Sequence, residues 1–196
     1  VSPRRAKKHI MYIKRVLNWS LENDILKTSD VTFPKLRREV LPRKIPIFLS
    51  KEEINALMSY ENKIPKFCNK KAHKNTIQTL SIIKFTLSTG RRIQEVVNLK
   101  KKDFDFELNI YHITKHKTEK TDPRPKVFVL SKRAKDIIKP LTDNMHDNDY
   151  VFSNYNGKKL KTSALGQRLK RILKNLGIKN IAFKELRHSF ATHMLM

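Results

Sequence analysis

Three short segments of this sequence hold the residue types that phosphoryl transfer without a metal ion requires. In Thr-Gly-Arg-Arg-Ile-Gln-Glu at 89–95, Arg92 stands at the start of a predicted helix, and Glu95 can brace it from three residues later. On a predicted apolar helix further along, Arg187 is costly to bury unless it is paired or faces a site. Lys117 lies in a lysine-rich loop.

The chemistry follows from charge and proton transfer. The non-bridging oxygens of a phosphoryl transition state must be neutralised by cations in fixed geometry, and the planar, always-charged guanidinium does this bidentately. A lysine, whose pKa is tunable, can donate a proton to the leaving oxygen. Taken one at a time, Arg92, Arg187 and Lys117 each fit a surface or structural role better than a catalytic one. Their order and setting favour a common site.

Composition points to a polyanionic partner. The chain of 196 residues carries 43 Lys and Arg against 18 Asp and Glu, a formal net charge of +25. Solubility needs a net charge of only about 2–8, so the excess favours nucleic acid or an anionic membrane surface as the partner. Between Asn156 and Asn180 there are eight basic residues and no acidic one, which favours contact with a phosphate backbone over a merely solvated basic face. The candidate DNA contacts are Lys158, Lys159, Lys161, Arg168, Lys170 and Arg171, with Arg37, Arg38, Arg43 and Lys44 earlier in the chain.

Other classes of protein fit poorly. A hydrophobic content of 39% with ten Phe excludes a disordered basic tail, and no apolar run is long enough to span a membrane. The N-terminal residues are not those of a signal peptide, and the lack of an initiator Met predicts a fragment or a processed chain. Cys68, the one cysteine, has no partner for a disulfide. We therefore expect a reducing intracellular compartment.

Two groups of residues could form a metal site instead. Asp103, Asp105 and Glu107 alternate as some nuclease carboxylates do, but no second acidic cluster or histidine accompanies them. We favour a polar edge leading into a hairpin, with the phenylalanines between these acids packed inward. His188 and His193 are five residues apart, which misses the spacing that places two ligands on one helical face. No metal site is predicted.

Hydrophobic periodicity predicts a mainly helical α+β domain with a small antiparallel sheet. Helices are expected over 4–26, 74–88, 91–99, 132–139, 162–176 and 184–196, and another begins at Ser50, where Ser50 and Glu53 form a capping box. Strands are expected over 109–114, 126–131 and 150–153, the first two as a hairpin around the lysine-rich loop. Residues 28–48, rich in proline and basic residues, are typical of an extended linker.

Together these segments resemble the tyrosine recombinase, or phage integrase, family. Residues 89–95 are similar to the family's first arginine box, Thr-Gly-x-Arg-x-x-Glu, which assigns the catalytic arginine to Arg92 rather than Arg91. The turn at Lys117 is similar to the family's catalytic-lysine turn, with Lys115 and Lys120 as alternatives.

The C-terminal helix and the N-terminal segment carry the rest of the resemblance. Residues 184–192 resemble the His-x-x-Arg box, which assigns the second arginine to Arg187. Residues 1–45 resemble the end of a helical core-binding domain with a basic linker, and 46–196 resemble the catalytic domain. The two arginine boxes, in this order and spacing, are the specific part of the match.

The resemblance implies site-specific DNA strand exchange through a 3′-phosphotyrosine ester, on double-stranded DNA, by a homotetramer acting on two sites. Arg92 and Arg187 would stabilise the oxyanion, and Lys117 would protonate the leaving 5′-oxygen. Lys184 would contact the phosphate or assist proton transfer, while Glu95 and His188 would position these groups. The ester conserves the bond energy, so the resemblance implies no metal or nucleotide cofactor. The location would be cytoplasmic, at the nucleoid.

Two features depart from the family pattern. Lys184 stands where the box has His, and lysine is a poor general base unless its pKa is lowered. The family's nucleophilic Tyr lies downstream of this helix, and none of Tyr12, Tyr60, Tyr111, Tyr150 and Tyr155 occupies that place. We therefore expect a fragment that binds DNA without cleaving it. The alternative is a non-catalytic basic DNA-binding protein.

Overall fold

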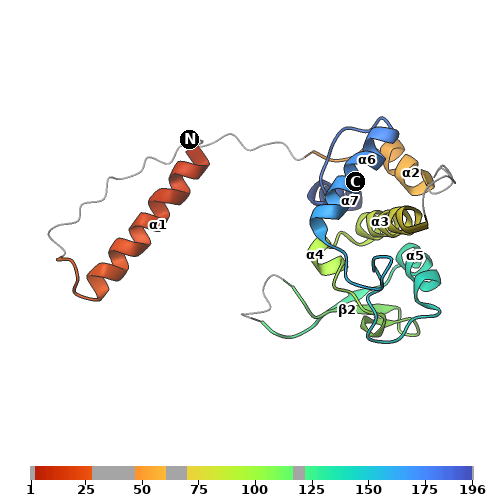
Figure 1. Ribbon diagram of the computed structural model, residues 1–196, viewed down its shortest axis with the longest axis horizontal. Coiled ribbons are helices and arrows are strands. Elements are labelled where there is room, and N and C mark those ends of the chain that lie inside the picture. Colours follow the sequence, from red (N-terminus) through yellow and green to blue (C-terminus); the bar gives the residue numbers. More distant parts are fainter. Residues whose placement is uncertain (1–2, 28–46, 61–69, 117–121, 196) are drawn as a thin grey trace. The chain divides into compact units, whose positions relative to one another are not determined.

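The computed structural model describes residues 3–27, 47–60, 70–116 and 122–195 (Figure 1). The chain divides into two compact units, Val1–Lys44 and Ile45–Met196. In the first unit, helix α1 spans Pro3–Glu22 and leaves Tyr12, Val16 and Trp19 largely exposed. Its assignment to a core-binding domain stays a prediction, and the predicted linker lies mostly outside the described residues, as does Cys68.

The second unit is mainly helical with one small sheet, as predicted. In chain order its elements are α2 (Lys51–Ser59), α3 (Lys70–Thr89), α4 (Ile93–Val96), the 3₁₀ turn η3 (Lys101–Asp103), β1 (Phe104–Asp105), β2 (Ile110–Ile113), β3 (Lys126–Val129), α5 (Lys132–Thr142), α6 (Thr162–Asn175) and α7 (Phe183–Leu195). The capping box at the start of α2 is confirmed: Ser50 Oγ accepts from Glu53 N–H, and the Glu53 carboxylate accepts from Ser50 N–H.

Helix α3 is the centre of the hydrophobic core. It packs against α2, α5, α6 and α7, so its side chains are buried on several faces rather than on one stripe. Leu80, Ile83 and Phe85 are at most 1% exposed. Helix α6 instead buries one face, through Leu165, Leu169, Ile172 and Leu173, as its period predicts. These contacts fix α7 beside the C-terminal end of α3, where the first arginine box begins.

The sheet is antiparallel in the order β1-β2-β3. Tyr111 of β2 faces Phe104 of β1 and Phe128 of β3, and these rings pack with Phe85 of α3 at centroid distances of 5.6–6.3 Å. The predicted hairpin is confirmed. Strand β1 was not predicted, because two residues are too few for the alternation of a strand to be recognised.

Several expected element bounds differ from the structure. The helix predicted over 4–26 ends at Glu22, and the helix predicted over 74–88 begins at Lys70. The helix predicted over 91–99 is a single turn, α4, followed by η3. The strand predicted over 150–153 is wrong: this segment forms only isolated bridges, Tyr150 with Lys100 and Ser153 with Lys159. The chain turns back directly afterwards, because the Asn154 side chain accepts from the N–H groups of Asn156 and Lys158. Helix α5 runs through Pro140 to Thr142, rather than ending at Lys139.

Candidate active site

The first arginine box forms a turn in which a buried carboxylate holds Arg92. Arg92 is the extended N-cap residue of α4. Glu95 Oε2 accepts from the Arg92 backbone N–H at 3.0 Å, and Glu95 Oε1 accepts from Arg92 Nη1 at 2.9 Å. The Glu95 side chain is 7% exposed, whereas that of Arg92 is 52% exposed. The brace predicted three residues apart is therefore present, and the guanidinium stays open to a ligand.

The neighbouring Arg91 is used differently. Its guanidinium lies 3.9 Å from the centroid of the Phe128 ring in β3, and its Nε donates to the Thr89 carbonyl at 3.0 Å. A cation on an aromatic face contributes about 0.5–2 kcal/mol, so Arg91 fastens the turn to the sheet. This difference between adjacent arginines supports Arg92, rather than Arg91, as the phosphate ligand.

Arg187 on α7 lies near this turn. Burial lowers the pKa of Arg187, the nearby positive charges of Arg92 and Arg91 lower it further, and Glu95 opposes them. Arginine stays protonated at neutral pH even so. Like charges held close together are unfavourable unless an anion joins them, so the arrangement suits a phosphate oxygen. The structure thus brings Arg187 close to Arg92 and Glu95, although Arg187 follows Arg92 by 95 positions in the sequence.

Gly90, which has no Cβ, lets α7 pack closely against the turn that holds Arg92. Gly90 has φ +64°, in the left-handed region, and a Cβ there would lie 2.3 Å from Phe190 Cδ1. Any side chain would strain the backbone and collide with the α7 ring. No sequence signal predicted this contact, because Gly90 and Phe190 are 100 positions apart.

The other predicted catalytic residues are placed less completely. Lys184 is exposed in the first turn of α7, one turn before Arg187, and His188 is half-buried beside it. Lys117, with the alternative Lys120, lies outside the described residues. Lys115 is described and exposed. The catalytic roles of these residues stay predictions.

Tyr111 is the tyrosine whose surroundings overlap with this site. It is 1% exposed, and its burial raises the pKa of the phenol, so the hydroxyl stays protonated and out of reach of a DNA phosphate. Tyr111 is therefore a core residue.

Most of the predicted DNA contacts around α6 are exposed. Lys158, Lys159, Lys161, Lys170 and Arg171 are on the surface. Arg168 is half-buried: its Nη1 is buried without a hydrogen-bond partner, and burial together with Arg171 lowers its pKa. Arg37, Arg38, Arg43 and Lys44 lie outside the described residues.

The start of α6 is tied to α4. Gln94 Nε2 donates to Thr162 Oγ1 at 3.3 Å, and Lys159 Nζ donates to Asn98 Oδ1. Gln94, Lys159 and Thr162 border an open cleft of about 370 Å³ that Lys161 and Ser163 also line. The basic segment is thereby held next to the Arg92 turn.

Two of the three alternating carboxylates, those of Asp103 and Asp105, accept hydrogen bonds from the backbone. Asp103 Oδ2 accepts from Lys100 N–H at 2.8 Å, and Asp105 Oδ1 accepts from the N–H groups of Glu107 and Leu108. Phe104 packs inward, as expected. In the described ranges, no group of three or more His, Cys, Asp or Glu could hold a metal ion. No described helix is both long and apolar enough to cross a membrane.

The mainly helical fold with its small antiparallel sheet is that of tyrosine recombinase catalytic domains, and the comparison with known proteins agrees. Residues 48–196 match the sequence profile of the Phage integrase family. Since the match covers most of the chain, the protein belongs to this family.

Its relatives include cellular and phage recombinases. The chain is 31% identical over 164 residues to the tyrosine recombinase XerA of Pyrococcus furiosus, covering 82% of this chain and 52% of that protein. It is 26% identical over 200 residues to XerC of Chlamydia trachomatis serovar D, covering 99% of this chain and 59% of that protein. The chain thus spans little more than half the length of these relatives.

Solved structures share the fold. The Tn1549 transposon integrase, in complex with circular intermediate DNA, superposes with a TM-score of 0.70 at 16% identity, covering all of this chain and 67% of that one. The XerH recombinase bound to its difH substrate gives a TM-score of 0.57 at 28% identity, covering 77% of this chain and 43% of that one.

Proposed function

We propose that these residues form the phosphate-binding part of a site-specific DNA recombinase. The observation that carries the proposal is the convergence of Arg92 and Arg187 beside the buried Glu95 carboxylate, with the Arg92 guanidinium half-exposed. Two fixed cations at one surface point are what a trigonal-bipyramidal phosphorane-like transition state requires. The DNA complexes of the related recombinases support the same substrate.

In the proposed reaction, a tyrosine hydroxyl attacks the scissile phosphorus. A bond forms between phosphorus and the tyrosine oxygen, and the bond from phosphorus to the 5′-oxygen breaks. Lys117 gives a proton to the leaving 5′-oxygen. Lys184 takes up the tyrosine proton in its neutral form, or binds the phosphate as a cation while solvent water takes up that proton. A free 5′-hydroxyl then attacks the 3′-phosphotyrosine ester in the reverse sense. Each step exchanges one phosphate ester for another, so the bond energy is conserved.

The polypeptide of these 196 residues carries no tyrosine after Tyr155. We propose that it binds duplex DNA without cleaving it, and that the reaction needs a tyrosine supplied from outside these residues. Incubation with a nicked suicide duplex, followed by denaturing electrophoresis, should give no covalent adduct with this polypeptide. A polypeptide from the same reading frame with a tyrosine after Met196 should give one. An adduct with the 196-residue polypeptide, or none with the longer one, would contradict the proposal.

Binding by the 196-residue polypeptide should depend strongly on salt. If about six phosphates are neutralised, the slope of log affinity against log salt is about −5, and affinity falls about 10³-fold between roughly 50 and 200 mM salt. Fluorescence anisotropy of a labelled duplex measures this. The Lys170→Ala/Arg171→Ala variant should make the slope shallower by about 2. Lys132→Ala/Lys139→Ala on α5 is the charge-matched control and should leave it nearly unchanged. Equal effects of the two pairs would place the interface elsewhere.

A further inference from the structure

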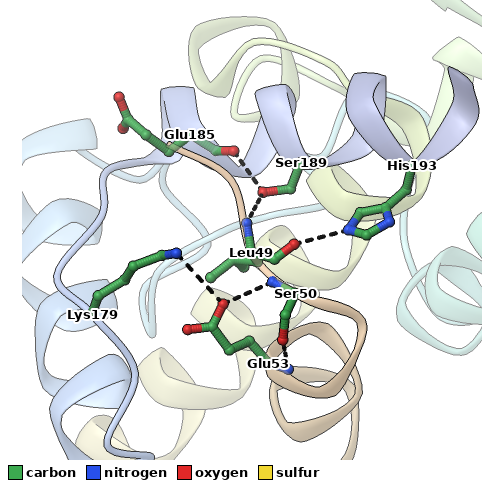
Figure 2. Close-up of polar contacts among 7 residues, drawn as sticks. All are labelled: Leu49, Ser50, Glu53, Lys179, Glu185, Ser189 and His193. Atoms are coloured by element: carbon green, nitrogen blue, oxygen red, sulfur yellow. Dashed lines mark hydrogen bonds and ion pairs between the residues drawn. The ribbon is translucent and has the colours of Figure 1, made fainter. Parts of the chain in front are cut away.

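Both peptide groups of Leu49 are held by side chains of α7, the helix that carries Arg187 (Figure 2). The Leu49 N–H donates to Ser189 Oγ at 2.9 Å, and that hydroxyl donates onward to the Glu185 carbonyl at 2.9 Å. His193 Nε2 lies 2.8 Å from the Leu49 carbonyl oxygen. Because a carbonyl can only accept, this ring nitrogen carries the proton and donates.

These hydrogen bonds are buried, and they pair the Leu49 N–H and C=O, which form no sheet hydrogen bonds with the described strands. Leu49 and Ser189 are both 0% exposed. In the described part of the chain the segment 47–50 pairs with no strand, so without the Ser189 and His193 side chains the Leu49 N–H and C=O would be buried and unpaired. A buried group left unpaired costs about 1–3 kcal/mol, so this segment, called here the Leu49 strap, has a strong preference for one position on α7.

The C-terminal end of the strap, at Ser50, is also held in place. Ser50 continues into the capping box of α2, and the Glu53 carboxylate of that box lies 3.9 Å from Lys179 Nζ, just before α7 (Figure 2). Phe48 adds an edge contact with the His193 ring, at a centroid distance of 6.4 Å. The strap is therefore itself held in place, so its hydrogen bonds can fix the position of α7.

The geometry of a helix links the strap to the active site. Ser189 and His193 are four residues apart and share a face, while Arg187, two residues before Ser189, points about 200° away around the axis. The strap holds one face of α7, and Arg187 leaves the opposite side. Phe190 against Gly90 is a further contact, in addition to the packing of α7 on α3. A rotation or slide of α7 would move Arg187 away from Arg92.

We propose that Ser189 and His193 are positioning residues: by holding the Leu49 backbone, they set the rotation and height of α7 that place Arg187 beside Arg92. The proposal rests on the proposed function only in taking these two arginines as the phosphate ligands. Neither residue touches the phosphate.

The experiment uses NMR spectra of the 196-residue polypeptide, with two readouts. The Gly90 amide signal reports the ring current of Phe190 and so the placement of α7. The Arg92 and Arg187 Nε–H signals, titrated with inorganic phosphate, report whether the pair binds one anion. In Ser189→Ala and in His193→Leu, the Gly90 signal should move, and the apparent dissociation constant for phosphate should rise at least about tenfold.

Two variants serve as controls. His193→Gln keeps a side-chain N–H that can reach the Leu49 carbonyl and should restore both readouts. Ser59→Ala removes a hydroxyl that, like that of Ser189, donates to the carbonyl four residues earlier, but in α2, and should change neither. Should Ser189→Ala fail to fold, the comparison of His193→Leu with His193→Gln decides alone. A Gly90 signal that stays in place in folded His193→Leu would overturn the positioning role. Absence of phosphate binding in the unchanged protein would count against the proposed function, and the Gly90 signal would still decide the positioning.

Discussion

Replacing Arg92 with alanine is expected to lower the rate of covalent DNA–protein adduct formation by about 10³-fold. Arg92 is held through Glu95 with its guanidinium half-exposed, so its charge is aimed outward and costs no reorganisation when the phosphate becomes more negative. The measurement is the rate of adduct formation on a nicked suicide duplex, by a polypeptide of the same reading frame that includes a tyrosine after Met196. DNA affinity should fall by no more than about tenfold, because one of many phosphate contacts is lost.

The adjacent arginine provides a matched control. Arg91→Ala removes the same charge one position away, but loses the stack on Phe128 rather than a ligand of the phosphate. We expect this variant to lose about 1 kcal/mol of stability and to keep its adduct rate within about tenfold of the unchanged protein. An Arg92→Ala variant that reacts at the original rate, or an Arg91→Ala variant that loses all reaction while folded, would reverse the assignment.

Gly90→Ala is expected to be the most destabilising small substitution near the site. The left-handed backbone costs about 1 kcal/mol for a residue with a Cβ, and overpacking against Phe190 adds about 1–3 kcal/mol. The free energy of unfolding should therefore fall by about 3 kcal/mol, and Tm by about 10 °C. Urea denaturation followed by circular dichroism measures the first quantity, and a thermal scan measures the second.

A double-mutant cycle separates the two causes. Phe190→Ala removes the ring that the new methyl group would strike, so the double variant should be at least about 1 kcal/mol more stable than the sum of the single effects predicts. Gly90→Asn tests the backbone, because asparagine tolerates the left-handed region but still carries a Cβ. If Gly90→Ala costs under about 1 kcal/mol, then the close approach of α7 does not constrain this turn.

The parts of the site that sequence analysis could predict are local. The Arg92–Glu95 pair follows from a spacing of three residues, and the α2 capping box from a four-residue pattern. The buried face of α6 follows from its period. In each case, the residues that interact are close enough along the chain for spacing alone to bring them together.

The parts that could not be predicted join distant segments. Local spacing favours Arg92 but gives no role to Arg91, whose role appears only when Phe128 is placed beneath its guanidinium. The Leu49 strap depends on residues 140 and 144 positions away. The strand wrongly predicted at 150–153 has the apolar residues of a strand, since Val151 and Phe152 are buried, but its neighbours form single bridges only.

The Leu49 strap also bears on the order of events during synthesis. Leu49 is made 140 residues before Ser189, so while those residues are being added its N–H and C=O can bond only to water or to temporary partners. Contacts of such long sequence separation form slowly, because a large loop must close before they are gained. The two arginines therefore become neighbours late, once α7 has been made and docked. In a nascent chain, the basic residues before and on α6 would therefore be present before Arg92 and Arg187 could bind one phosphate together.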